Sequence, residues 1–287
     1  MVYKGLKERI LKTIAEIEGP RDGMLSYDGL VRTAGYLRQR FSELGFIVNS
    51  DDFQLKGRQY SNIIATGEPL EDNKNWVLVG AHYDAVQGSP GADDNASGVA
   101  VMLEVARLIG PRKGLMFVGF TLEEPQAKVV DFLIGSRHFV KVMKRKGHGF
   151  SAVFVLESVG FKSTVPGSQL RPPLVEVPET GDFIGLVGNK KAQTHMELFE
   201  GIAKRYVPEL KVMSHTVKLK GHLLPESRFS DHAPFWDEGF PAVMITDTAM
   251  FRNPYYHTPE DRLEYLDGEF MAEITTALEK TLEELLQ

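Results

Sequence analysis

The chain has 287 residues, of which 43% are hydrophobic and 25% are charged, as is typical of a globular protein. Its net charge of −6 disfavours nucleic acid and anionic membrane surfaces as partners. Because it contains no cysteine, disulfides, thiolate metal sites and cysteine nucleophiles are excluded, and any metal ion must be held by nitrogen and oxygen atoms.

At the N-terminus, residues 1–20 lack the unbroken apolar stretch of a signal peptide. Apolar residues recur there at the spacing of an amphipathic helix: Leu6, Ile10, Leu11, Ile14 and Ile17. No stretch of the sequence approaches the roughly 18 apolar residues of a membrane span. We therefore expect a cytoplasmic protein with no membrane partner.

A second amphipathic helix is predicted over residues 27–45, where Gly45 provides the stop signal. Apolar, β-branched runs then predict strands near residues 47, 62, 76, 115, 152, 183, 211 and 242. Helical patterns lie at about 96–109, 129–145 and 192–206, and a last helix closes the chain. Strands that are apolar throughout and alternate with helices predict an α/β fold whose sheet is covered on both faces.

The sequence shows no repeat and no linker of biased composition, so we expect one domain over residues 1–287. The one long stretch rich in proline and glycine is 164–182. Strand-like sequence flanks it on both sides, which predicts an elaborated loop around 160–182 and not a domain boundary. The basic run 141–146 is expected to be the solvated end of a helix, where cations suit the helix dipole.

Histidines and acidic residues follow several predicted strands or lie in glycine-rich loops: His82, Asp94, Glu123, Glu124, Glu157 and His257. Each has an ordinary interpretation when taken alone, such as a hydrogen-bonded histidine, a solvated carboxylate pair or a helix N-cap. Functional side chains of open α/β sheets gather at the carboxyl ends of the strands. The combination therefore predicts a site for a divalent metal ion such as zinc.

Five motifs in order resemble those of the M28 family of zinc aminopeptidases: AHYDAV, GADDNASGVA, TLEE, SDHAPFWDEGFPAV and YYHTPEDRLEYLD. The resemblance covers roughly residues 60–287. It implies a zinc-exopeptidase-like, three-layer α/β/α fold with a central mixed, mostly parallel sheet. It also implies a two-zinc enzyme that removes the N-terminal residue from peptides with a free N-terminus.

Carried over residue by residue, the resemblance implies one zinc ion held by His82 and Glu157 and a second held by Glu124 and His257. Asp94 would bridge the two. Two divalent ions at close range need a shared anion to offset their repulsion, and a bridging carboxylate together with a hydroxide serves this purpose. Cobalt or manganese is also compatible with such ligands.

The same resemblance implies three catalytic roles. Glu123 matches the general base, which takes a proton from the bridging water and later delivers it to the departing amine. Asp84 is expected to accept the second imidazole N–H of His82 and so to fix its tautomer. Tyr256 is expected to present its hydroxyl to the tetrahedral oxyanion, with Tyr255 as the competing choice.

Other residues of the motifs are expected to shape the pocket. Asp231 and His232 would support its floor without binding zinc. Three aromatic residues suggest that the pocket prefers an apolar substrate side chain: Phe229, Phe235 and Phe240.

The sequence departs from the family pattern at two points. Glu157 stands where family members usually have aspartate, so the carboxylate is one methylene further from the backbone. The Gly135–Ser136 pair comes later after the paired glutamates than is usual, which predicts an enlarged loop beside Glu124 at the substrate entrance.

Two alternatives to a peptidase remain. A glutaminyl cyclase-like transferase with a single zinc would keep the counterparts of Asp94, Glu124 and His257. A catalytically silent binding protein would keep the fold without turnover. The metal content and the hydrolysis of aminoacyl-anilides distinguish the three. Nothing in the sequence predicts an oligomeric state.

Overall fold

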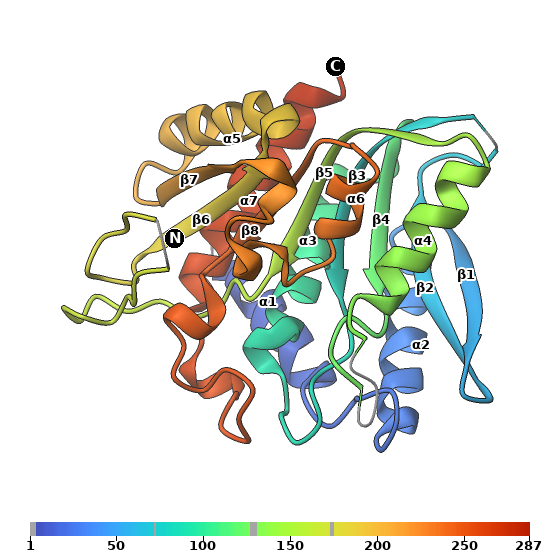
Figure 1. Ribbon diagram of the computed structural model, residues 1–287, viewed down its shortest axis with the longest axis horizontal. Helices are drawn as coiled ribbons and strands as arrows, with labels where there is room; N and C mark the ends of the chain where they lie inside the picture. Colours follow the sequence, from blue (N-terminus) through green and yellow to red (C-terminus); the bar gives the residue numbers. More distant parts are fainter. Residues whose placement is uncertain (1–3, 72, 127–130, 173–174) are drawn as a thin grey trace.

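The computed structural model describes residues 4–71, 73–126, 131–172 and 175–287 (Figure 1). Within these residues the strands are β1 (Ile47–Leu55), β2 (Arg58–Thr66), β3 (Asn75–His82), β4 (Leu115–Phe120), β5 (Gly149–Glu157), β6 (Phe183–Asn189), β7 (Lys211–Val217) and β8 (Ala242–Thr246). The α-helices are α1 (Lys4–Ile17), α2 (Tyr27–Glu43), α3 (Gly98–Ile109), α4 (Ile134–Arg145), α5 (Gln193–Tyr206), α6 (Ala233–Asp237) and α7 (Gly268–Leu285).

The strands form one sheet in the order β1-β2-β4-β3-β5-β8-β6-β7. Its centre, β4-β3-β5-β8, is parallel throughout, and β7 runs parallel to β6. Antiparallel pairs join β1 to β2, β2 to β4 and β6 to β8. The prediction of a mixed, mostly parallel sheet is confirmed.

Strand β4 shows why the central strands are apolar throughout. Successive side chains of a strand point to opposite faces, and both faces of this sheet are covered. Leu115 and Phe117 pack into a core shared with α1, α2, α3, α5 and α7. Met116 and Val118 pack on the other side with residues of α4 and α6. Figure 1 shows α4 and α6 in front of the sheet and α1 and α3 behind it, so the predicted three-layer arrangement is confirmed.

Helix α6 was not predicted, and the other helices differ from the prediction mainly at their starts. The helix predicted over 129–145 begins only at Ile134, although residues 129–130 lie outside the described part of the chain. The backbone N–H groups of Leu133 and Ile134 donate to the carbonyls of Glu123 and Leu122, so the chain returns to the end of β4 before the helix begins. The basic run 141–146 lies at the C-terminal end of α4, as predicted.

The segment between β5 and β6 covers the range in which the sequence predicts an elaborated loop. Ser163 and Gly181 form an isolated β-bridge at its base, and the described residues of 164–182 form neither helix nor strand. Residues 173–174 lie outside the described part. Among the helices described, none is long and apolar enough to cross a lipid bilayer.

Candidate metal centre

The strand ends bring the predicted site residues together. His82 is the last residue of β3, Glu157 is the last residue of β5, and Glu123 and Glu124 follow shortly after β4. Because β4, β3 and β5 are adjacent and parallel, their carboxyl ends meet at one edge of the sheet. The five predicted ligands, His82, Asp94, Glu124, Glu157 and His257, are called the candidate metal centre below.

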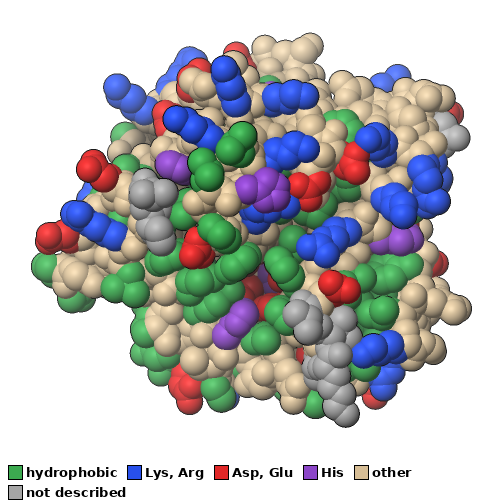
Figure 2. Space-filling model, viewed as in Figure 1, with side chains coloured by type: hydrophobic (Ala, Val, Ile, Leu, Met, Phe, Trp, Pro, Cys, Tyr) green, Lys and Arg blue, Asp and Glu red, His purple; other side chains and the backbone are tan. Residues whose placement is uncertain are grey.

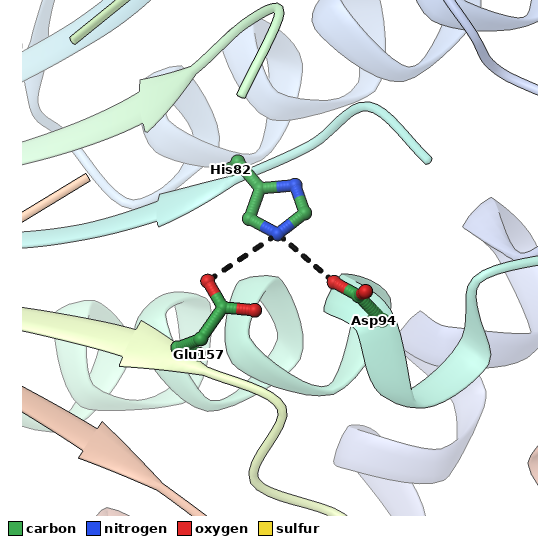
Figure 3. A group of neighbouring side chains, drawn as sticks. All are labelled: His82, Asp94 and Glu157. Carbon is green, nitrogen blue, oxygen red and sulfur yellow. Dashed lines mark ion pairs between the residues drawn. The ribbon is translucent and has the colours of Figure 1, made fainter. Parts of the chain in front are cut away.

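The first half of the centre is formed by His82, Asp94 and Glu157. Nε2 of His82 lies 3.0 Å from Oδ1 of Asp94 and 3.5 Å from Oε2 of Glu157. Figure 3 shows both contacts starting from the same ring nitrogen, with the imidazole directed between the two carboxylates. All three side chains are buried.

The second half is formed by His257, Asp94 and Glu124. Nε2 of His257 lies 3.1 Å from Oδ2 of Asp94 and 3.1 Å from Oε1 of Glu124. Asp94 therefore presents one carboxylate oxygen to each half. In each group of three residues the donor atoms lie within 4.8 Å of one another.

The arrangement of the donor atoms suits coordination of divalent cations better than hydrogen bonding among the donors themselves. Nε2 of His82, Oδ1 of Asp94 and Oε1 of Glu124 are buried and have no hydrogen-bond partner among the described residues, although their neighbours are about 3 Å away. Buried polar atoms without a partner are rare in folded proteins. Atoms that converge on a common point without bonding to each other, in a set of nitrogen and oxygen donors, match the coordination preferences of zinc.

The pKa values of the residues in and beside the centre are also strongly shifted. Burial and, next, the nearby charge of Asp94 raise the pKa of Glu124 to about 8, against the opposing effect of His257. Burial also raises the pKa of Glu123 and of Glu157. Burial lowers the pKa of His257, but Asp94 and Glu124 outweigh this effect and bring it to about 10. Apart from Asp94, these groups thus hold on to protons, as expected of crowded buried carboxylates.

Asp84 contacts the paired glutamates more closely than it contacts His82. Its Oδ1 accepts the backbone N–H of Glu123 and its Oδ2 that of Glu124, each at 3.1 Å. Nδ1 of His82 lies 3.5 Å from Oδ1 of Asp84 and forms no hydrogen bond there. Asp84 therefore fixes the backbone that carries Glu123 and Glu124. Its predicted role as the acceptor for His82 stays a prediction.

The two neighbouring tyrosines lie in different surroundings. Tyr255 stacks on Tyr265, with ring centres 4.1 Å apart, and also contacts Phe161. Tyr256 stacks on His257 at 3.9 Å and lines the cavity beside Glu157. Burial, and then the nearby carboxylates, raise the pKa of Tyr256. Of the two hydroxyl groups, that of Tyr256 is the one near the candidate metal centre.

The turn that carries Asp94 is fixed by contacts that the sequence analysis did not identify. Asn95 donates to the carbonyl of Leu156 at 2.7 Å and accepts the N–H of Ser158 at 3.2 Å, which joins the turn to the end of β5. Asp261 accepts the N–H of Asp94 at 3.1 Å. The peptide bond between Asp94 and Asn95 is cis. Asn95 and Asp261 lie inside the motifs quoted above. Membership of these motifs was the only sign in the sequence that the two residues belong to the site.

Three consecutive buried residues of the SDHAPF motif follow Phe229, and the first of them contacts the centre. Ser230 donates to Oε2 of Glu157 at 2.7 Å. His232 is buried, its Nε2 lies 2.7 Å from the carbonyl of Ser227, and burial lowers its pKa to about 3. His232 is therefore a neutral donor within the SDHAPF motif. Asp231 is buried beside them, and burial raises its pKa to about 8.

Arg21 was not identified from the sequence. Its buried guanidinium donates to four backbone carbonyls, including those of Tyr83 at 2.9 Å and Gly91 at 2.6 Å. These two residues delimit the loop between His82 and Asp94. Arg21 thus holds that loop against the N-terminal segment. No local pattern in the sequence predicts such a contact.

The three aromatic residues predicted to shape the pocket separate into two groups. Phe235 belongs to α6 and is buried in the core with residues of α4, and Phe240 packs against that core. Phe229 lines the cavity beside Glu157, and its ring contacts Phe132 at 5.9 Å. Phe132 belongs to the predicted enlarged loop after Glu124, so the described part of this loop reaches the edge of the cavity.

Comparisons with known proteins agree with this geometry. The model of peptidase family M28 matches residues 62–282. The uncharacterized protein YfbL of Escherichia coli is 31% identical in an alignment of 281 positions that covers 93% of this chain and 84% of that protein. Aminopeptidase YwaD of Bacillus subtilis is 28% identical over 72% of this chain and 41% of its own length. This chain thus spans less than half of YwaD.

Solved structures match over nearly the whole chain. LapA of Legionella pneumophila superposes with a TM-score of 0.74 at 20% identity, covering 98% of this chain and 73% of that one. The glutaminyl cyclase of Porphyromonas gingivalis superposes with a TM-score of 0.72 at 18% identity, covering 97% of this chain and 98% of that one. At these identities the matches show the fold alone.

Proposed function

The chain belongs to peptidase family M28, and on that premise we propose that it is a zinc aminopeptidase that hydrolyses the N-terminal residue from peptides. The observation that carries this proposal is Asp94, whose two carboxylate oxygens face His82 and His257 at 3.0 and 3.1 Å. A single shared carboxylate between two sets of nitrogen and oxygen donors suits a pair of divalent cations.

In this proposal His82 and Glu157 would hold one zinc ion, Glu124 and His257 would hold the other, and Asp94 would be shared by both. Bound there, the ions would lower the pKa of a water molecule and polarise the scissile carbonyl group. Glu123 accepts the proton of the attacking water and passes it to the departing amine. The hydroxyl of Tyr256 donates to the oxyanion as the carbonyl carbon becomes tetrahedral.

Residues around the centre keep this arrangement in place. Asp84 holds the backbone of Glu123 and Glu124 through two hydrogen bonds, so that the base and the ligand keep their relative positions. Ser230 orients the carboxylate of Glu157. A base that is fixed by its surroundings loses little entropy on reaching the transition state.

A glutaminyl cyclase-like transferase is the second candidate, because solved glutaminyl cyclases share the fold. Such an enzyme with a single zinc would need only Asp94, Glu124 and His257. The chain also keeps His82 and Glu157 at 3.0 and 3.5 Å in a second group of donors. That second group favours the peptidase.

The test begins with purified protein that has been stripped with a chelator and then reconstituted with zinc. We expect close to two zinc ions per chain, and hydrolysis of aminoacyl-anilides that is lost on chelation and restored by zinc. One zinc per chain with cyclisation of an N-terminal glutamine would support the cyclase instead. Full zinc binding without turnover of any aminoacyl-anilide, dipeptide or glutaminyl substrate would support a silent binding protein.

A further inference from the structure

A cavity of about 190 Å³ adjoins the candidate metal centre at Glu157 and Tyr256. Figure 2 shows hydrophobic side chains gathered around a hollow near the middle of this face of the molecule, with acidic side chains visible inside it. Most of the cavity wall comes from β6, β7, β8 and the segments 224–229 and 249–251. Its apolar members include Phe183, Val187, Met213, Leu224, Met244 and Phe251.

The size and position of the cavity suit one substrate side chain. Pockets for whole drug-sized ligands are usually larger, at about 300–1,000 Å³. An aminopeptidase accommodates a single residue on the amino side of the scissile bond, whereas the rest of the peptide extends towards solvent. A cavity of this size beside Glu157 and Tyr256 therefore fits the side chain of the N-terminal residue.

The cavity contains one polar group of an unusual kind, the carboxylate of Glu226. Its Oε2 is buried, and the carboxylate has no hydrogen-bond or ion-pair partner among the described residues. A buried carboxylate oxygen without a donor is unfavourable unless a ligand supplies one. Such an arrangement is suited to binding a positively charged group.

The other residues of the wall do not neutralise Glu226. Among its described residues there is no lysine or arginine, and a second carboxylate, that of Glu176, adds further negative charge. His215 also lines the cavity, and burial lowers its pKa, which disfavours a positively charged imidazole there. The cavity thus combines apolar walls with a negative charge.

We propose that Glu226 is a specificity-determining residue that binds the cationic end of a lysine or arginine side chain at the N-terminus of the substrate. The aliphatic stem of such a side chain lies along the apolar wall, while its charged head reaches the carboxylate. This inference rests on the proposed aminopeptidase function. It replaces the purely apolar preference suggested by Phe229, Phe235 and Phe240.

The test compares two probes that differ only in the terminal amine, L-lysinamide and L-norleucinamide. Their dissociation constants are measured by calorimetry with the zinc-reconstituted protein. We expect wild-type protein to bind lysinamide at least about tenfold more tightly, and Glu226→Gln to reduce this ratio at least about tenfold. The substitution removes the charge but keeps the shape of the side chain. Glu179→Gln is the control, because Glu179 is exposed and does not line the cavity, and it should leave the ratio unchanged.

A wild-type ratio near one, binding of neither probe, or a ratio that survives in Glu226→Gln would overturn the assignment. Hydrolysis of lysyl- and norleucyl-anilides is measured in parallel to separate the two proposals. Turnover without preference for the lysyl substrate defeats the role of Glu226 and leaves the aminopeptidase intact. A Glu226-dependent preference in binding without any turnover supports the cation site and defeats the aminopeptidase.

Discussion

Glu123 and Glu124 are adjacent in sequence, yet the proposed function gives them different tasks. The carboxylate of Glu124 lies 3.1 Å from Nε2 of His257 and belongs to the group of donor atoms. Glu123 is also buried but is absent from both groups of donors. A carboxylate beside the centre that holds no ion is free to move protons.

Replacement of Glu123 by glutamine tests that division. We expect Glu123→Gln to lower kcat by a factor of about 10² to 10⁴, because proton transfer is lost, while two zinc ions remain bound. Steady-state kinetics and metal analysis of the same preparation measure both effects. If turnover stays within a few-fold of wild type, Glu123 is not the base. If zinc is lost, Glu123 is a ligand.

Ser230 provides a test of the less usual ligand, Glu157. Its hydroxyl donates to the carboxylate of Glu157 at 2.7 Å and thereby orients the longer side chain. Removal of a partner that orients a ligand typically reduces metal affinity by about 10- to 100-fold. We expect Ser230→Ala to weaken the binding of one of the two zinc ions by at least about tenfold.

A competition titration against a zinc-binding dye measures both affinities. Ser227→Ala is the matched control, since the hydroxyl of Ser227 donates to a backbone carbonyl, that of Leu224, and not to a ligand. Equal affinities of the Ser230 variant and wild type for both ions would show that Glu157 needs no such support.

At the scale of elements, Gly135 at the start of α4 packs closely against the segment that follows β4. A Cβ atom on Gly135 would lie 1.9 Å from the carbonyl oxygen of Thr121 and 2.7 Å from Oδ1 of Asn62. Asn62 in turn donates to the carbonyl of Gly135 and accepts the N–H of Thr121. The backbone of Thr121 cannot withdraw without disturbing the approach to Glu123 and Glu124.

We therefore expect Gly135→Ala to reduce the free energy of unfolding by about 1–3 kcal/mol through overpacking. Gly201 lies within α5, and a Cβ there meets no atom within 4 Å. Gly201→Ala should instead raise the free energy of unfolding by about 0.5–1 kcal/mol, because alanine favours a helix. Chemical denaturation of both variants measures the difference, and equal destabilisation by the two would contradict the packing argument.

The elements themselves were largely predictable from the sequence. Runs such as those at 76 and 115 are apolar on both faces, and this pattern identifies buried strands whatever their neighbours are. The direction of pairing was not predictable in the same way. Nothing in the apolar run of β6 indicates that it lies antiparallel to β8, because the pattern records burial and not orientation.

The residues of the site were also predictable only in part. His82 and Glu157 were predictable because each ends an apolar run, and such ends meet at one edge of a parallel sheet. The contacts that fix them join residues far apart in the chain. Arg21 reaches the carbonyl of Gly91 across 70 residues, and Asp261 reaches the N–H of Asp94 across 167. A single sequence carries no local sign of such a pairing.

For the whole molecule, the buried carboxylates link stability to pH and to metal content. In chelated protein the pKa of Glu124 rises from 4.5 to about 8 and that of Asp231 from 3.8 to about 8, chiefly through burial. Above their ordinary pKa values, the folded chain keeps protons that the unfolded chain has released. The stability contributed by these protons is complete at acid pH and is lost as the pH rises towards 8.

His257 also makes the protein less stable as the pH rises, but over a higher pH range. Its pKa rises from 6.5 to about 10 in the folded protein, so its contribution is also lost as the pH rises, mainly between these two values. Asp94 contributes to the pH dependence of stability with the opposite sign, because His257 and His82 outweigh its burial and lower its pKa. Its contribution changes only at pH values below about 3.8, the ordinary pKa of an aspartate. Between about pH 5 and 8 the net expectation for chelated protein is therefore a fall in stability.

Zinc reverses this balance, because the cations take the place of the protons and bind more tightly as the ligands deprotonate. We expect the difference in melting temperature between zinc-loaded and chelated protein to widen steadily from about pH 5.5 to about pH 8. Calorimetric scans in buffers of matched ionic strength, with zinc or with chelator, measure this difference. Glu260→Gln is a suitable control, since that carboxylate is exposed and outside the centre, and it should reproduce the wild-type curves. Parallel curves for the two forms across this range would mean that the cluster of His82, Asp94, Glu124, Glu157 and His257 does not exchange protons for metal ions.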